Sequence, residues 1–204
     1  MIDGSVRAFV DRLASSAATP GGGSAAALAG ALAAGLTAMV ARLSVGRGGD
    51  DEAFDQSIRT AEQAAATLLA LVDRDAEAFD RVIAAMRLPR GSDHEKQIRR
   101  TAVQDALQHA TAIPLTTAEQ AVLVLALTPD LARAGNPNAV SDAGVAALLA
   151  HAAVRGALLN VAINLKSITD ARYRDATAAR ADELRQRAEE LRDAAMDLVG
   201  AGTG

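Results

Sequence analysis

The chain has 204 residues, of which 50% are hydrophobic and 23% are charged, and its formal net charge is −4. This length and this balance of hydrophobic and charged residues predict a globular protein with a sizeable core and exclude a disordered chain. Because Lys and Arg are mixed among Asp and Glu, a broad nucleic-acid-binding face is not expected. Aromatic residues make up only 2%, so small aliphatic side chains must fill most of the core, which favours closely packed helices.

The chain contains no cysteine, which removes disulfides, thiolate nucleophiles and Cys-ligated zinc and fits a reducing compartment. Residues 1–18 lack a basic region followed by an apolar one, so no signal peptide is predicted and a cytoplasmic location is expected. The uncharged run 24–41 approaches the length of a membrane span. Gly30, Gly35 and Thr37 interrupt it and most of its apolar residues are alanine, so we expect no membrane insertion.

Two helices are expected around a glycine-rich stretch near the N-terminus. Apolar residues at helical spacing predict the first over 4–17, and Pro20 to Gly23 then break the chain. Ser24 is the expected N-cap of the second helix, which combines an apolar stripe with a face of small residues and should be buried on most sides. The stripe comprises Leu28, Leu32, Leu36, Met39 and Leu43, and the small face comprises Ala26, Gly30 and Ala34.

A long helix is predicted for 51–88, because neither Pro nor Gly occurs there. Its apolar residues recur alternately every three and four positions, as in a heptad seam. One member of this seam is a carboxylate, Asp75. The seam comprises Phe54, Ile58, Ala61, Ala65, Leu68, Val72, Asp75, Phe79, Val82 and Met86.

Helical patterns continue beyond this seam. Ser92 and Glu95 form a capping-box pattern for a helix that we expect to end before Pro114. Another helix is expected after Pro114, kinked or split by Pro129 and capped by Gly135.

Two further helices complete the predicted bundle. Ser141 and Asp142 are candidate caps of an apolar helix, and Asp170 is a candidate cap of a final charged one. The apolar helix is expected to face the core with Val145, Leu149, Ala152, Gly156, Leu159 and Ile163. No alternating strand pattern occurs, so we predict an all-α, single-domain bundle of about six or seven helices over 1–204, with long antiparallel helices.

The glycine-rich stretch allows two interpretations. Gly21, Gly23 and Ala26 satisfy the spacing of a dinucleotide fingerprint, but that motif follows a strand, and the lysine of a Walker A loop is missing. What remains is a helix N-terminus whose backbone N–H groups suit an anion or a carbonyl oxygen. The alternative is that the glycines only permit a sharp turn and close packing.

Asp75 is the most informative single residue, because its seam neighbours Val72, Phe79 and Val82 are apolar. Burial would raise the pKa of its carboxyl group, as a group that exchanges protons near neutral pH requires. The alternative is a structural carboxylate that pairs with an arginine, caps another helix or reaches solvent.

Other polar residues also have two interpretations. Asn160 and Asn164, one helical turn apart, either orient a polar ligand or tie helices together. Lys96, Arg99 and Arg100 form a basic cluster that is either a solvated face or a site for a carboxylate-bearing ligand. The three histidines lack a metal-ligand spacing, so no metal site is predicted.

Four stretches together resemble the cyclodeaminase/cyclohydrolase family, which includes the C-terminal domain of formimidoyltransferase-cyclodeaminase and free-standing methenyltetrahydrofolate cyclohydrolases. They are "TPGGGSAAALAGALAAGLTAMVA", "LVDRDAEAFDRVIAAMRLPR", "EKQIRRTAVQDALQHATAIPL" and "GNPNAVSDAGVAALLAHAAVRGALLNVAINLKSITD". The resemblance spans about residues 5–172 in the same order and with similar spacing.

The resemblance implies that Asp75, the second aspartate of the family's VDxDxxAF motif, is the catalytic residue. It also implies a substrate pocket formed by residues of the family's other motifs. These are Pro20, Gly21, Gly22, Gly23, Ser24, Arg47, Lys96, Arg99, Asn136, Ser141, Asp142, Asn160 and Asn164.

The resemblance further implies a homodimer that binds a tetrahydrofolate derivative as substrate and has no prosthetic group. The chain leaves no room for a formimidoyltransferase domain, so a free-standing enzyme is expected. We expect reversible hydrolysis of 5,10-methenyltetrahydrofolate to 10-formyltetrahydrofolate in one-carbon metabolism, with Asp75 as general base. The alternatives are a 5-formiminotetrahydrofolate cyclodeaminase, which releases ammonia, and a non-catalytic folate-binding or scaffold protein.

Overall fold

A computed structural model describes residues 4–203. Residues 1–3 and 204, which the expected domain range includes, lie outside the described residues. Residues 4–203 form six α-helices and one short 3-10 helix without any strand, which confirms the all-α expectation and the expected number of helices. The helices are α1 (Val6–Leu13), α2 (Gly22–Ser44), α3 (Asp51–Met86), α4 (Asp93–Ala134), η1 (Pro137–Ala139), α5 (Val140–Leu165) and α6 (Ala171–Thr203).

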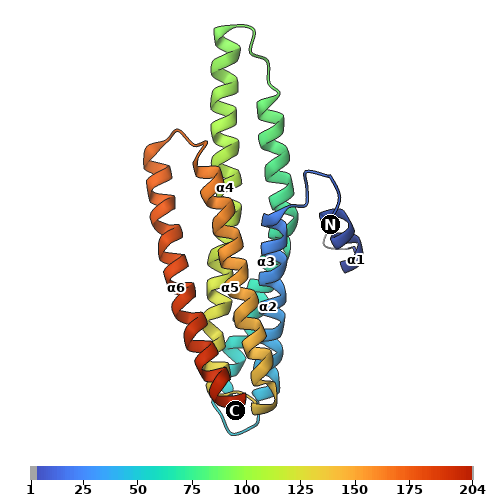
Figure 1. Ribbon diagram of the computed structural model, residues 1–204, viewed down its shortest axis with the longest axis vertical. Coiled ribbons are helices and arrows are strands. Elements are labelled where there is room, and N and C mark those ends of the chain that lie inside the picture. Colours follow the sequence, from blue (N-terminus) through green and yellow to red (C-terminus); the bar gives the residue numbers. More distant parts are fainter. Residues whose placement is uncertain (1–3, 204) are drawn as a thin grey trace.

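The helices α2 to α6 run along the long axis of the molecule, and consecutive ones run in opposite directions (Figure 1). Helix α2 packs against α3, α4 and α5, and α6 packs against α4 and α5. The short helix α1 stands beside the bundle. The ends of α3 and α4 project beyond the other helices as a hairpin, which we call the arm and define as residues 85–104.

Small residues form the interior of this bundle. Gly30 lies so close to α3 that a Cβ atom on it would be 3.1 Å from a methyl carbon of Leu68. Helices can approach this closely only where their facing side chains are small. The buried alanines of α2 and α5 comprise Ala26, Ala27, Ala31, Ala33, Ala34, Ala38, Ala41, Ala143, Ala146, Ala147, Ala150, Ala153 and Ala157.

Several of the larger apolar residues of α2 and α5 lie on the opposite side, at the surface. The expectation that Val145, Leu159 and Ile163 face the core is wrong, because these residues are 47%, 72% and 57% exposed, and Ala152 of the same expected face is exposed as well. Leu32 and Leu43 of α2 are exposed as well, but 13 of the 23 residues of α2 are buried, which confirms that this helix is buried on most sides. Close helix contact places the small face inward, and the larger side chains are therefore left outside.

Helix α4 is continuous, so the expected break at Pro114 is wrong. Proline lacks the N–H that would donate to the carbonyl four residues earlier. Side chains replace both missing bonds: Asn164 Nδ2 donates to the Ala110 carbonyl at 3.1 Å, and Thr128 Oγ1 donates at 2.8 Å to the Leu125 carbonyl, which Pro129 leaves free. These bonds allow 42 residues to form one helix.

Some predicted helix ends are confirmed and others are shifted. The capping box of Ser92 and Glu95 is present, and the Asp170 carboxylate accepts a hydrogen bond from the Tyr173 N–H in the first turn of α6. Helix α2 starts earlier than expected, with Gly21 as N-cap in place of Ser24. The first helix is shorter than expected and ends at Leu13. Ser141 and Asp142 lie in the first turn of α5, after the cap.

Three segments are long and apolar enough to cross a membrane by length and composition alone: α2, part of α4, and residues 137–165. In the bundle, 61% of the relevant stretch of α2 is buried against other helices, as is 44% of each of the other two. Packing between helices thus accounts for much of this apolar character.

Candidate active site

A pocket of about 290 Å3 lies where the N-terminus of α2 meets α3, α4 and α5. Its wall combines backbone of the glycine-rich stretch with polar and apolar side chains. The lining residues are Ala18, Thr19, Gly21, Gly22, Gly23, Asp75, Phe79, Val82, Leu107, Ala110, Asn160 and Asn164. The structure therefore brings together six residues that the sequence assigns to the site: Asp75, three glycines and two asparagines.

Asp75 extends from α3 to the first turn of α2. Ser24, which is fully buried, donates a hydrogen bond to Asp75 through its backbone N–H. Its hydroxyl lies 3.0 Å from Asp75 Oδ2 and 2.9 Å from the Val72 carbonyl, so its single proton can go to either acceptor. Ser24 thus lies behind the carboxylate and orients it, and it does not line the pocket.

Gly23 is what allows this close approach. A Cβ atom at position 23 would lie 2.1 Å from Asp75 Oδ1 and 2.6 Å from Asp75 Cγ, which is far inside any permitted contact. The neighbouring Gly22 differs, because the nearest atom to its Cβ position is Asn160 Nδ2 at 3.8 Å. The glycines therefore do more than allow a turn: one of them makes room for the carboxylate.

Burial raises the pKa of the Asp75 carboxyl group above its ordinary value. The two hydrogen bonds from Ser24 lower this pKa, but the loss of solvation is the larger influence. The group can therefore hold a proton at a higher pH than an exposed aspartate. This property suits a residue that accepts and returns protons.

The two asparagines on α5 present acceptor atoms beside the carboxylate. Asn160 Nδ2 donates to the Gly156 carbonyl at 2.9 Å, and Asn164 Nδ2 donates to the Ala110 carbonyl at 3.1 Å. Because each amide nitrogen is directed to a helix carbonyl, each amide oxygen is left as the group that can accept a hydrogen bond from a ligand. Asn164 ties α5 to α4, as the second interpretation of these residues expects, and it also lines the pocket.

Sequence reasoning missed the apolar part of the wall. Phe79, Val82 and Leu107 line the pocket next to Asp75. The position of Phe79 four residues after Asp75 was a usable signal, because residues four apart share one face of a helix. Leu107 gave no such signal, since only the packing of α4 against α3 brings it there.

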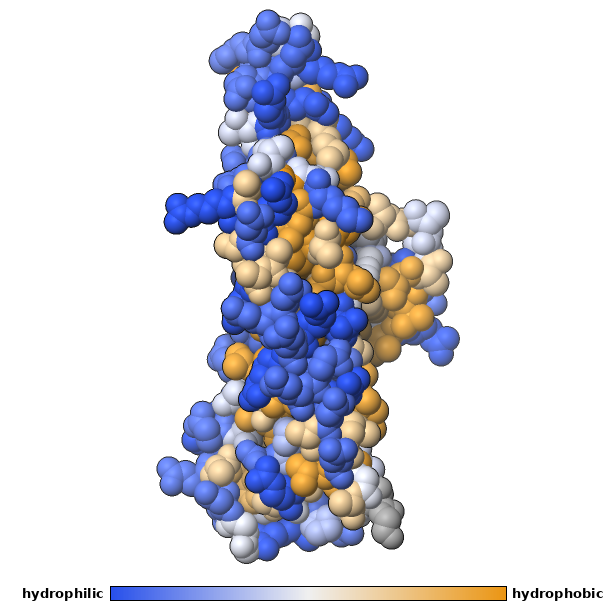
Figure 2. All heavy atoms as spheres, turned by 60° about the vertical axis from the view of Figure 1, so that its left-hand side comes forward, coloured by the Kyte–Doolittle hydropathy of each residue, from blue (hydrophilic) through white to orange (hydrophobic). Residues whose placement is uncertain are grey.

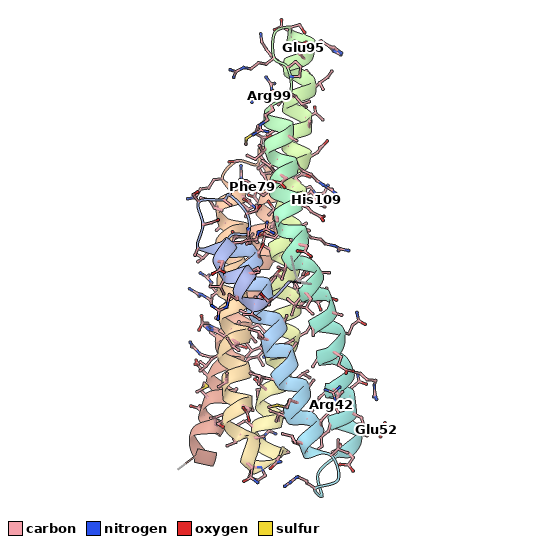
Figure 3. All side chains as sticks on the ribbon, turned by 90° about the vertical axis from the view of Figure 1, so that its right-hand side faces the viewer. Arg42, Glu52, Phe79, Glu95, Arg99 and His109 are labelled. Atoms are coloured by element: carbon pink, nitrogen blue, oxygen red, sulfur yellow. The ribbon has the colours of Figure 1, made fainter. Side chains whose placement is uncertain are left out.

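Four expected site residues lie at the other end of the bundle. Arg47 is in the loop between α2 and α3, about 33 Å along α2 from Gly22 at 1.5 Å per residue. Asn136, Ser141 and Asp142 lie at the same end; Figure 3 marks it by Arg42 and Glu52. Within one subunit these residues do not reach the pocket.

Asn136 has an evident structural task at that end. Its backbone N–H donates to Ser44 Oγ at 2.8 Å, and its Nδ2 donates to the Leu43 carbonyl at 3.2 Å. Its Oδ1 accepts from the Asn138 N–H at 3.0 Å. The side chain thus fastens the connection between α4 and α5 to the C-terminus of α2.

The remaining expected residues lie outside the wall of the pocket. Pro20 is buried in the turn that leads into α2. Lys96 and Arg99 belong to the arm, beyond Phe79 in Figure 3. Within residues 4–203, no group of three or more His, Asp or Glu side chains is placed to hold a metal ion.

The fold and the pocket define a class of protein. It is an all-helical protein in which a partly buried carboxyl group, backbone N–H groups of a helix N-terminus and amide oxygens converge on a small cavity. Such an arrangement suits proton transfer to and from a polar ligand.

Comparisons with known proteins identify the family. The profile of the family described as Formiminotransferase-cyclodeaminase matches residues 5–183. Methenyltetrahydrofolate cyclohydrolase of Methylorubrum extorquens is 41% identical over 173 residues, which cover 83% of both chains. The chain therefore belongs to the formiminotransferase-cyclodeaminase family.

A second relative and a solved structure agree with this assignment. Formimidoyltransferase-cyclodeaminase of Rattus norvegicus is 38% identical over 190 residues, which cover 91% of this chain and 35% of that relative. The chain thus spans about a third of the length of the bifunctional relative. The crystal structure of formiminotetrahydrofolate cyclodeaminase from Thermotoga maritima matches with a TM-score of 0.88 at 28% identity, over 98% of both chains.

Proposed function

We propose that the protein hydrolyses 5,10-methenyltetrahydrofolate to 10-formyltetrahydrofolate, reversibly, in one-carbon metabolism. The observation that carries this proposal is the position of Asp75, held against the N-terminus of α2 at the wall of the pocket with a raised pKa. The cyclohydrolase relative, which matches over most of both chains, supports the choice of reaction.

The proposed reaction needs an oriented water molecule and a group that exchanges protons. The methenyl carbon, which bridges N5 and N10 as an amidinium, is already electrophilic. Asp75 accepts a proton from water as the oxygen bonds to this carbon, and a carbinolamine forms. Asp75 then returns the proton to N5 as the bond between that carbon and N5 breaks. The hydroxyl proton is released to solvent, and the formyl group stays on N10.

The rest of the pocket would bind the pterin ring and the developing oxygen. The N–H groups of Gly22 and Gly23 lie in the first turn of α2, where no intrahelical acceptor exists for them. They are suited to an oxygen that gains negative charge. The amide oxygens of Asn160 and Asn164 suit the N–H donors of a pterin, and Phe79 offers an apolar contact.

The cyclodeaminase reaction is the second candidate. The relative from Rattus norvegicus and the structure from Thermotoga maritima carry this activity in their names. In that reaction Asp75 would shuttle protons while N10 attacks the formimino carbon and ammonia leaves. The pocket suits both reactions because each needs one proton-exchanging group beside the same bridge carbon.

One pair of assays tests the proposal. Purified protein is given 5,10-methenyltetrahydrofolate or 5-formiminotetrahydrofolate, while methenyl absorbance and ammonia are followed. Catalytic loss of absorbance is expected with the first substrate, and Asp75→Asn should lower kcat by about 10²- to 10⁴-fold. Ammonia release with the second substrate would establish the deaminase instead. A spectral shift in proportion to the protein, without turnover, would mean a folate-binding protein, and near-normal turnover by folded Asp75→Asn would reject the mechanism.

We further propose that the protein acts as a homodimer in the cytoplasm, with residues 1–204 as one domain and without a prosthetic group, metal, membrane or nucleic acid. The exposed apolar residues on α2 and α5 support the homodimer, because contiguous apolar surface of this kind marks contact sites. This surface, which we call the α2/α5 face, comprises Leu32, Met39, Leu43, Val145, Leu148, Leu159 and Ile163.

A second copy would also give Arg47, Ser141 and Asp142 access to a pocket. Helices α2 and α5 run in opposite directions, with the pocket at one end of the α2/α5 face and these residues at the other. A twofold axis across the middle of the face places each end of one subunit against the opposite end of its partner. Their proposed role in substrate binding therefore depends on the dimer.

A further inference from the structure

Helix α1 is the one α-helix of residues 4–203 that stands apart from the bundle (Figure 1). Of its eight residues only Phe9 is buried. A helix of this length is marginal by itself in water, because it gains few hydrogen bonds after the costly first turn. Contact of its apolar residues with another surface is therefore what holds such a helix in place.

The apolar residues of α1 divide into a covered part and an uncovered part. Phe9 joins the core cluster that contains Ala26 from the first half of α2. Val6, Val10 and Leu13 are exposed, and their spacing of four and three residues places them along one side of the helix. We call these three residues the α1 stripe. The bundle thus covers Phe9, whereas the α1 stripe faces away from the rest of residues 4–203.

The α1 stripe adds apolar surface beside the α2/α5 face. Helix α1 stands next to α2 in Figure 1, and the projecting part of the molecule in Figure 2 carries hydrophobic surface next to the hydrophobic edge of the bundle. Stable interfaces bury about 800 Å2 on each partner. Full burial of a large aliphatic side chain removes on the order of 100 Å2 from water, so the seven partly exposed residues of the α2/α5 face supply roughly half of that area. A dimer formed through this face therefore needs more surface, and the α1 stripe can supply it.

A second copy of the chain would bring an apolar surface to the α1 stripe. Gly22 and Gly30 of α2 lie beside Asn160 and Ala153 of α5, so the second half of α2 lies beside the first half of α5. The part of the α2/α5 face that is remote from the pocket, which we call the far end, therefore comprises Met39, Leu43 and Val145. A twofold axis across the middle of the face places the first half of α2, where α1 stands, against the far end of the partner.

The segment between α1 and α2 forms part of the pocket wall. It covers residues 14–21, and Ala18, Thr19 and Gly21 line the pocket. In the part of the chain that the structure describes, the hydrogen bonds of residues 14–19 run only within this segment and to α1. Ser15 Oγ, for example, donates to the Arg12 carbonyl at 2.7 Å. The position of this wall therefore depends on where α1 is held.

We propose that α1 docks through the α1 stripe on the far end of a second copy of this chain, and that this contact holds residues 14–21 at the wall of the pocket. The inference rests on the proposed homodimer and goes beyond it, because it assigns the contact that connects assembly to the pocket. Each subunit provides one α1 and receives one, so the contact occurs twice in the dimer. It is independent of which folate reaction the pocket catalyses.

Disulfide trapping tests the contact directly, because the chain has no cysteine of its own. Val10→Cys is combined in turn with Met39→Cys, Leu43→Cys and Val145→Cys, and each variant is oxidised mildly. At least one pair should give a covalent dimer, since two cysteines can be bridged only where their Cα atoms lie within about 7 Å. The matched control is Ala8→Cys with the same partners, because Ala8 is exposed and lies about 200° around α1 from Val10. The control pairs and each single-cysteine variant should stay uncross-linked.

A charge on the α1 stripe tests what the contact does. Val10→Glu should raise the Kd of the dimer by about tenfold or more, because it places a carboxylate in an apolar contact. Ala8→Glu adds the same charge on the other side of the same helix and should leave this Kd unchanged. At a protein concentration where light scattering shows both variants as dimers, KM for the folate should be raised severalfold in Val10→Glu and unchanged in Ala8→Glu.

The outcomes separate this contact from the homodimer and from the activity. A wild-type dimer whose α1 forms no cross-link with any of the three positions, or whose Kd is the same in Val10→Glu, would overturn the docking of α1 and leave the proposed homodimer standing. A wild-type KM in dimeric Val10→Glu would overturn the link to the pocket wall. A wild-type protein that is monomeric at micromolar concentration would reject the homodimer and this contact together, whereas turnover of folate tests the proposed reaction separately.

Discussion

Asp75 is under two opposing influences. Burial favours its neutral form, whereas the hydrogen bonds from Ser24 and the N-terminus of α2 favour its charged form. Because burial is the larger influence, the carboxyl group stays protonated to a higher pH than usual. The small energetic difference between its two forms is what a proton-exchanging group needs.

The geometry of this carboxylate depends on the missing side chain at position 23. We expect Gly23→Ala to displace Asp75, because the new Cβ atom would lie 2.1 Å from Asp75 Oδ1. A shift of about 1 Å in a catalytic group can cost about 10²-fold in rate, so kcat should fall by roughly that factor. Steady-state kinetics and circular dichroism measure activity and folding together.

Gly22→Ala is the matched control, because its Cβ would meet only Asn160 Nδ2 at an ordinary 3.8 Å. It should keep kcat within a fewfold of the wild type. Equal losses in both variants would mean that the turn, and not room for the carboxylate, requires glycine.

The raised pKa of Asp75 also predicts how stability depends on pH. A carboxyl group whose folded pKa lies above its unfolded value supports folding fully below the unfolded pKa, near the ordinary 3.8. This support is lost as the pH rises through the folded pKa. Asp75→Asn stays neutral, so its Tm should exceed that of the wild type near pH 7, and the difference should shrink toward pH 3. A lower Tm for the variant at pH 7 would mean that the hydrogen bonds from Ser24 outweigh burial.

At the scale of the elements, α4 shows how a side chain can extend a helix through proline. Asn164 supplies the hydrogen bond that Pro114 cannot give to the Ala110 carbonyl. Because Asn164 also lines the pocket, the continuity of α4 and the shape of the site depend on one residue.

This dual role can be measured with a double-mutant cycle. Asn164→Leu should destabilise the protein by about 1 kcal/mol or more, because the Ala110 carbonyl loses its donor. Pro114→Ala restores a backbone N–H at that carbonyl, so Asn164→Leu should cost less in this background. Urea unfolding of the wild type, the two single variants and the double variant gives the coupling. Additive effects would show that the bond from Asn164 does not replace the missing one.

Elements with local signals were predictable, and elements that depend on distant partners were not. The capping box of Ser92 and Glu95 and the cap at Asp170 lie within one turn of the helices they begin, and both are confirmed. The break at Pro114 was predicted wrongly, because its compensation comes from a residue 50 positions later in the sequence. Only tertiary packing brings that donor to α4.

At the scale of the whole molecule, the α2/α5 face is the main feature that a single subunit leaves unexplained. Seven large apolar residues are exposed along two adjacent antiparallel helices. Figure 2 shows hydrophobic surface along one edge of the bundle and on the projecting part beside it. Burying such a surface against a second copy would stabilise a dimer by about 25 cal/mol for each Å2 of apolar area removed from water.

We expect Leu159→Arg to weaken the dimer, because a charge would be placed where an exposed leucine of the α2/α5 face meets the partner. Light scattering after size exclusion should report a molar mass near that of one subunit, 20.9 kDa, for the variant and twice that mass for the wild type. Leu123→Arg is the control, since Leu123 is exposed on α4 beside α3, outside the face. A wild-type protein that is monomeric at micromolar concentration would reject the proposed dimer.

The sequence by itself determined the helical class, the seam on α3 and the special position of Asp75 on it. These follow from periodicity and from the identities of neighbours within two turns, and the family motif reinforced them. The sequence also indicated the glycines 21–23 and the pair Asn160 and Asn164 as site residues, because each group lies within a single turn or a single helix.

Only the tertiary structure decided which of these residues meet. Asp75 and Gly23 come together because α2 and α3 are packed through small residues, whereas Arg47 and Asn136 lie about 33 Å away along α2. The direction of the faces of α2 and α5 was decided in the same way: alanines allow close contact and turn inward, and several of the larger apolar residues are left outside. A periodic pattern identifies two faces of a helix, but which face is buried depends on the distance between helices, and that distance is fixed by the side chains of both partners.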